Sequence, residues 1–179
     1  MKALVVYESL YGNTAAIGEA IATSLRTQGL EVDAGLVSKI DPAEAARADL
    51  LVVGGPTHAH GMSRPSTRKT AADDQANTFA EPTVTPGLRE WTNDLPPGAG
   101  RLAAAFDTRI DKSVILTGSA AKGIARRLER HGYRLVVGPE CFLVSTKNRL
   151  LDEETAHATR WGGEVASGAT ARIAHQPGV

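Results

Sequence analysis

The chain has 179 residues and a mass of 18.8 kDa, which is the size of one domain of about 150 residues. Lys and Arg number 20, as do Asp and Glu, so the chain lacks the basic balance of a general nucleic-acid binder. The single Cys141 excludes an internal disulfide and any multi-cysteine metal site, and fits a reducing compartment. No apolar run approaches the ~20 residues of a membrane span. We therefore expect a cytoplasmic protein with no nucleic-acid or membrane partner.

The N-terminal part of the chain alternates strand and helix patterns. Residues 4–7 form an apolar, β-branched run that is typical of a strand buried on both faces. Apolar residues at helical spacing from Ile17 to Leu25 predict a helix that ends near Gly29. A weaker strand over residues 30–37, a short helix from Asp41 and an apolar strand over residues 50–53 follow, the last stopped by Gly54-Gly55-Pro56. This order predicts a parallel sheet.

Residues 61–100 break this rhythm. The stretch from residue 64 to residue 86 is polar with few large apolar side chains, which predicts an extended or partly helical surface excursion, followed by a short helix at residues 87–95. Regular patterns then predict a strand at 102–106, a helix at 119–131, a strand within 135–144 and a last helix from Asp152. Trp161, Val165, Ala169 and Ile173 lie four residues apart on that last helix. We expect residues 1–179 to form a single domain.

The predicted elements define an α/β fold with helices on both faces of a five-stranded parallel sheet. Because crossovers between parallel strands are right-handed, few topologies remain, and five strands favour the doubly wound order 2-1-3-4-5. In that order a ligand binds outside the carboxyl ends of strands 1 and 3. The segments at that place are residues 8–14 and 54–62.

The first of these segments can hold an anion. It joins a strand to the N-terminus of a helix, where main-chain N–H groups lack partners. Ser9 and Thr14 add hydroxyl donors, and Gly12 and Asn13 tolerate a left-handed turn. The segment contains no Lys or Arg, and neither the nucleoside triphosphatase nor the dinucleotide fingerprint is present. It predicts one terminal phosphate bound by neutral donors; the alternative is that Thr14 or Asn13 only caps the helix.

The second and third segments suit a planar ring. Residues 54–62 offer two imidazoles, His58 and His60, and the thioether of Met62, while residues 106–109 follow the fourth strand at the same edge. Two histidines spaced i, i+2 without a nearby third ligand argue against a metal site, and solvated loop histidines are the alternative. Arg109 can approach a ring edge or form a surface ion pair. The sequence predicts no catalytic triad, and we expect Cys141 to be a buried packing residue rather than a nucleophile.

Together the three segments resemble the flavodoxin-like FMN proteins. Residues 9–14, Ser-Leu-Tyr-Gly-Asn-Thr, are similar to the family's phosphate loop, Ser/Thr-x-Thr-Gly-x-Thr, and Ser-x-Tyr-Gly also resembles flavin-dependent quinone reductases. Residues 55–62 are similar to the second flavin loop, with histidine where the family commonly has an aromatic cover. Residues 106–109 are similar to the third loop in position but lack its Tyr or Trp.

This resemblance implies a flavodoxin-like fold, FMN as the cofactor, and a set of cofactor-binding residues from all three segments. The set is Ser9, Leu10, Tyr11, Gly12, Asn13, Thr14, Pro56, Thr57, His58, Ala59, His60, Gly61, Phe106, Asp107, Thr108 and Arg109. It includes no catalytic side chain and no metal ligand.

Three functions remain open on the sequence. The first is an electron carrier between redox partner proteins, and the second is an FMN-dependent NAD(P)H:quinone-type reductase. The third is a flavin-free binding module. Conventional flavodoxins are strongly acidic, whereas here the positive residues Lys122, Arg126, Arg127, Arg130 and Arg134 cluster within a balanced chain. That cluster is either a solvated helix face or a docking patch for an acidic partner.

Overall fold

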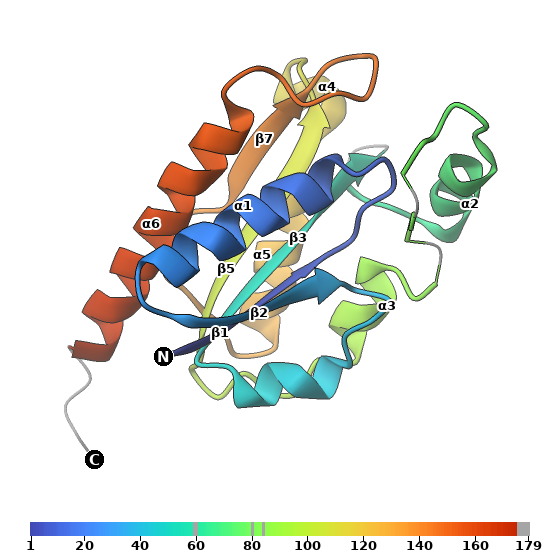
Figure 1. The fold of residues 1–179 in the computed structure, drawn as a ribbon. Coiled ribbons are helices and arrows are strands. Elements are labelled where there is room, and N and C mark those ends of the chain that lie inside the picture. Colours follow the sequence, from blue (N-terminus) through green and yellow to red (C-terminus); the bar gives the residue numbers. More distant parts are fainter. Residues whose placement is uncertain (59–60, 80, 84, 175–179) are drawn as a thin grey trace.

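The computed structural model describes residues 1–58, 61–79, 81–83 and 85–174 (Figure 1). Its centre is a parallel sheet in the order β2-β1-β3-β5-β6. These strands are β1 (Lys2–Tyr7), β2 (Glu31–Leu36), β3 (Leu50–His58), β5 (Leu102–Ile110) and β6 (Arg134–Leu135). The doubly wound order predicted from the sequence is thereby confirmed.

The predicted fifth strand is divided in two. After β6, the chain returns to the sheet as β7 (Glu140–Val144), which pairs in parallel with the second half of β5. A short strand, β4 (Gly61–Met62), pairs antiparallel with the end of β3. Both additions lengthen the sheet at its carboxyl edge, where the predicted site lies.

Helices cover both faces of the sheet (Figure 1). On one face α1 (Asn13–Thr27) packs against α6 (Glu154–Ala174), and on the other lie α3 (Leu88–Asn93), α5 (Ala120–Arg130) and the short 3-10 helix η1 (Pro42–Arg47). Helix α2 (Pro65–Asp73) stands apart from these layers beside the carboxyl end of β3, and α4 (Val114–Thr117) follows β5.

Two apolar clusters, one on each face, form the core. Ile17, Ile21 and Leu25 of α1 meet the α6 residues Trp161 and Val165, so the periodicity seen in both helices marks buried faces. Ile173 departs from this pattern: it is 45% exposed, because the last turn of α6 runs past the sheet. The central strands are buried over most of their length because helices cover both of their faces.

Residues 61–100 are not only the surface excursion that their polarity predicts. Leu88, Trp91 and Leu95 are buried in the second cluster, and the indole N–H of Trp91 donates to the carbonyl of Ile40 at 2.7 Å. Leu88 and Trp91 lie on α3 and Leu95 just after it, so this helix belongs to the core.

Two predicted strand ends are wrong. Gly54-Gly55-Pro56 does not stop β3, which continues to His58, and residues 106–109 are not a loop but part of β5. The two extensions pair with each other, and the extension of β5 also pairs with β7 on its other side. Glycine suits the middle of β3 because a Cβ at Gly54 would lie 2.0 Å from the ring of Phe106. These glycines therefore permit close packing rather than a turn.

Candidate functional site

The three predicted segments meet in one cleft of about 230 Å³ at the carboxyl ends of β1, β3 and β5. This is the edge at which doubly wound sheets hold their ligands. The lining residues come from the turn into α1, the end of β3, the end of β5, helix α4, the end of β7 and the loop after it. They are Leu10, Tyr11, Asn13, Thr14, Pro56, Thr57, His58, Thr108, Arg109, Ile110, Leu116, Thr117, Val144 and Asn148.

The turn between β1 and α1 is shaped by Gly12. Its φ of 88° lies in the left-handed region, which glycine enters without strain, and it directly precedes the first residue of α1. The ring of Phe79 lies where a side chain at this position would project, since a Cβ built on Gly12 would be 3.1 Å from its Cδ2. The turn thus depends on glycine for both its conformation and its packing.

Main-chain donors gather in this turn. Among the residues that the structure describes, no acceptor is found for the N–H groups of residues 10–14, whereas the N–H groups of Ser9 and Ala15 on either side are bonded. Successive free N–H groups at a helix N-terminus carry partial positive charge and form a cradle for an anion. This part of the cleft fits a phosphate group without any cationic side chain.

The hydroxyls predicted for this turn point inward. The Oγ of Ser9 accepts a bond from the N–H of Ala15 at 3.2 Å, and the Oγ1 of Thr14 lies 2.7 Å from that of Thr108. Both Ser9 and Thr14 are buried. They brace the turn against α1 and β5, which leaves the main-chain N–H groups as its free donors.

Residues 74–79 and 81–83 lie over the same turn. The amide of Asn77 donates to the carbonyl of Leu10 at 2.8 Å, and the N–H of Thr83 donates to the carbonyl of Ser9 at 2.8 Å. Tyr11 reaches the segment from the other side through its hydroxyl, which donates to Asp74 at 3.3 Å. Sequence reasoning missed this contact, because nothing in the local pattern of a polar segment indicates what it packs against.

The second segment contributes Pro56, Thr57 and His58 to the cleft. Burial lowers the pKa of His58 from its ordinary value, so the imidazole is neutral near pH 7. Gly61 lies in β4 and lines a different hollow, beside α5. Two further predicted residues, Ala59 and His60, fall outside the described part of the chain.

The third segment divides between cleft and core. Thr108 and Arg109 line the cleft, while Phe106 is fully buried and packs edge to face against Phe142 and Trp161. Asp107 is also buried; its Oδ2 accepts bonds from Thr57 at 3.0 Å and from the N–H of Ala121 at 2.8 Å. Asp107 thereby ties the end of β3 to the first turn of α5.

Among the described residues, Arg109 does not form the ion pair considered for it. Its Nη1 donates to the carbonyl of Lys112 and so holds the loop after β5. Its Nε is buried, and its positive charge opposes the rise that burial causes in the pKa of the neighbouring Cys141 thiol. Arg109 therefore lines the cleft while its guanidinium group braces the surrounding structure.

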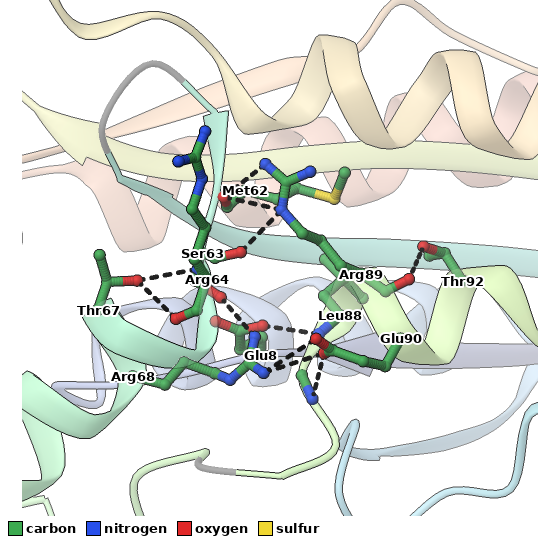
Figure 2. A network of polar contacts seen from close by, with 11 residues as sticks. Glu8, Met62, Ser63, Arg64, Thr67, Arg68, Leu88, Arg89, Glu90 and Thr92 are labelled. Carbon is green, nitrogen blue, oxygen red and sulfur yellow. Dashed lines mark hydrogen bonds and ion pairs between the residues drawn. The ribbon is translucent and has the colours of Figure 1, made fainter.

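A charged network begins at Glu8, the residue just before the turn into α1 (Figure 2). Glu8 is 0% exposed, and its Oε2 accepts a bond from the N–H of Leu88 at 2.7 Å. Burial raises the pKa of Glu8, which the bond from Leu88 and the positive charge of Arg68 oppose. Arg68 is itself only 2% exposed and pairs with Glu90 at 3.0 Å. This network joins β1, α2 and α3 around the cleft.

Neighbouring features offer no further chemistry. Cys141 is half-buried, and burial, followed by the charge of Asp107, raises its thiol pKa, which disfavours the reactive thiolate. Within residues 1–58, 61–79, 81–83 and 85–174, no three His, Cys, Asp or Glu side chains gather in a manner that could hold a metal ion. Over the same residues, no helix combines the length and the apolarity needed to cross a membrane.

Comparison with known proteins agrees with this geometry. The family model for flavodoxin matches residues 5–97, which is over half of the chain. A flavodoxin from the domain Archaea is 22% identical, with a TM-score of 0.67, over 95% of this chain and 99% of its own. The flavodoxin of Streptococcus pneumoniae TIGR4 is 19% identical, with a TM-score of 0.68, over 93% and 99%.

Larger proteins contain a similar unit. The rubredoxin oxygen:oxidoreductase of Desulfovibrio gigas is 16% identical, with a TM-score of 0.60, over 97% of this chain but only 37% of its own. No curated protein sequence matches the chain. Both the family model and the fold point the same way, and the chain therefore belongs to the flavodoxin family, whose members bind FMN.

Proposed function

We propose that this protein is an FMN-dependent electron carrier that exchanges electrons with redox partner proteins in the cytoplasm. The observation that carries the proposal is the row of free main-chain N–H groups over residues 10–14, at the sheet edge where the family holds its cofactor. FMN, when bound, supplies the redox chemistry, while the protein supplies binding, orientation and electrostatics.

The residues of the cleft take distinct roles in this proposal. The N–H groups of residues 10–14 hold the phosphate, and the buried hydroxyls of Ser9 and Thr14 support the turn that presents them. The ring system lies between the end of β3 and the end of β5, where Arg109 lines the cleft. Ala59 and His60, predicted from the sequence to flank the ring, complete the second segment.

An apolar rim beside the cleft supports exchange with a protein. Ile115 and Leu116 of α4 are 86% and 68% exposed, and Leu116 also lines the cleft. Exposed apolar side chains gathered at the mouth of a site suit a small, transient protein contact. In the described part of the cleft, no side chain is arranged as a nucleophile with a base, as group-transfer catalysis would require.

Spectra and reduction kinetics test the proposal against the two alternatives. Purified protein incubated with excess FMN and then desalted is expected to stay yellow, and to be reduced only slowly by NADH or NADPH in stopped-flow mixing. Prompt bleaching by either nucleotide identifies the NAD(P)H:quinone-type reductase instead. A protein that remains colourless identifies the flavin-free binding module.

The phosphate assignment has its own test. Ser9→Ala combined with Thr14→Ala is expected to weaken FMN binding at least tenfold more than riboflavin binding, because only FMN carries the phosphate; isothermal titration measures both affinities. Ser167→Ala combined with Thr170→Ala, which removes two hydroxyls from α6, is the control. Equal losses for FMN and riboflavin would show that the phosphate lies elsewhere.

A further inference from the structure

A second hollow, on the face of the sheet that carries α5, is lined by four arginines. It has a volume of about 720 Å³ and runs between β4, α3 and α5. Arg89 comes from α3, whereas Arg126, Arg127 and Arg130 come from two successive turns of α5. These four residues define what we call the arginine groove. A smaller hollow at its far end, which shares Arg127 and Arg130, extends it to His131.

The positive charges of the arginine groove are not neutralised within the protein. None of its four arginines forms an ion pair with a described residue. Glu129 lines the groove, but Glu90 on the neighbouring helix is taken by Arg68. Burial and then the nearby charges of Arg89 and Arg130 lower the pKa of Arg127, an effect that the charge of Glu90 only partly opposes. Such a cluster attracts an anionic partner.

One end of the arginine groove touches the segment that leads out of the cofactor cleft. Arg89 donates from Nε to the carbonyl of Ser63 at 2.8 Å and from Nη2 to that of Met62 at 2.9 Å, as Figure 2 shows. These bonds fix the side chain and leave its Nη1 unbonded to any described residue. Gly61 and Met62, which line the groove, are the last two residues of the second cofactor segment. A partner held here lies beside that segment.

We propose that the arginine groove is the docking site for an acidic surface of a redox partner protein. The inference rests on the proposed carrier function and names the chemistry of the partner. The arginine groove differs from the basic cluster predicted from the sequence. Arg89 joins the groove from another helix, whereas Lys122 and Arg134 do not line it.

The shape of the arginine groove favours a row of carboxylates over a nucleotide. Three of its arginines lie in the last five residues of α5 and the fourth comes from α3, so its cations are carried by two helices. None of the described lining residues is a Phe, Tyr or Trp against which a base could stack. Arg126 and Arg130 are exposed, so they can meet the side chains of a second protein. Exposed cations of this kind steer a transient encounter.

Electron transfer from an acidic protein tests the docking site. The probe is a photoreduced, plant-type [2Fe–2S] ferredoxin of strongly negative net charge, mixed with the FMN-loaded protein at low salt. Arg126→Glu combined with Arg130→Glu is expected to lower the bimolecular rate constant at least tenfold. The matched control is Arg160→Glu combined with Arg172→Glu on α6, which changes the net charge equally on the opposite face and should lower the rate less than threefold. FMN affinity and reduction by dithionite should not change in either variant, which verifies that both fold.

Each result decides the proposal. The proposal is supported if the rate constant falls in the Arg126/Arg130 variant but not in the control, and if high salt removes the difference between the two. Equal rates in the two variants overturn the docking site while leaving the carrier function intact. A wild-type protein that ferredoxin cannot reduce but NADPH can overturns both the carrier function and the docking site. NADPH reduction that the Arg126/Arg130 variant alone loses would make the groove a nucleotide site and so overturn the proposal.

Discussion

The phosphate turn, residues 9–14, and the arginine groove both suit anions, but by opposite means. The turn has no cationic side chain and offers main-chain N–H groups that the fold holds in place. The groove offers guanidinium groups on partly exposed side chains. Fixed dipoles in a site sheltered from water hold a small ligand tightly, because they need no reorganisation. Exposed cations attract a partner over a longer range but bind it weakly, which suits a complex that must dissociate after each encounter.

The largest expected effect comes from the network that joins these two regions. Arg68→Met leaves the buried carboxylate of Glu8 without its nearby positive charge and frees Glu90, so we expect the free energy of unfolding to fall by about 3–5 kcal/mol. Urea denaturation measures the loss. Arg64→Met is the control, since Arg64 is exposed and only its main-chain atoms hold the start of α2. A loss no larger than that of the control would show that the network does not support the fold.

A smaller effect separates the phosphate turn from the groove. Gly12→Ala adds a Cβ in a left-handed conformation and against the ring of Phe79, so we expect FMN affinity to fall at least tenfold. Gly29→Ala is the matched control: it has a φ of 84° but open space around its Cβ, so it carries similar strain away from the cleft. Titration with FMN compares the two, and equal affinities would contradict the role given to the turn.

The turn and the arginine groove should also differ in how strongly their binding depends on salt. Raising the ionic strength from about 20 mM to 300 mM should change the dissociation constant of FMN less than threefold, because the turn is sheltered and neutral. The rate constant with the acidic ferredoxin should fall at least tenfold over the same range. Fluorescence titration and stopped-flow kinetics measure the two quantities. An FMN affinity that falls as steeply as the ferredoxin rate would mean that side-chain charges, not main-chain dipoles, hold the phosphate.

The smallest expected effect is a dependence of stability on pH. Because burial lowers the pKa of His58, the unfolded chain binds a proton that the folded chain refuses as the pH falls below about 6.5. The contribution of His58 to stability is therefore full above that value and declines as the pH falls toward the lowered pKa of the folded state. Urea denaturation at pH 7.5 and 5.5 should show a smaller loss for His58→Gln than for the wild type. If the variant and the wild type lose the same stability between these two pH values, the proton is taken up by another group.

Much of the site was predictable because it depends on strand order. Once buried strands and amphipathic helices alternate, the turn before α1 and the ends of β3 and β5 must share one edge of the sheet. The structure accordingly brings together Tyr11, Thr14, Thr57, His58 and Thr108. Phe106 belongs instead to the core, because alternation along β5 places it on the same face as Leu102 and Ala104. The sequence did not show this, because it does not reveal that pairing with β7 extends the strand beyond Phe106.

The sequence by itself determined the sheet order, the buried faces of α1 and α6, and a turn before α1 that carries no cationic side chain, because each follows from local periodicity or from residue types at a strand end. Only the tertiary structure decided which N–H groups stay free, that Phe79 and Thr83 cover the turn, and that Arg89 joins Arg126 and Arg130. Those features arise between segments far apart in the chain. Its balanced net charge therefore conceals a local excess of cations that packing alone assembles.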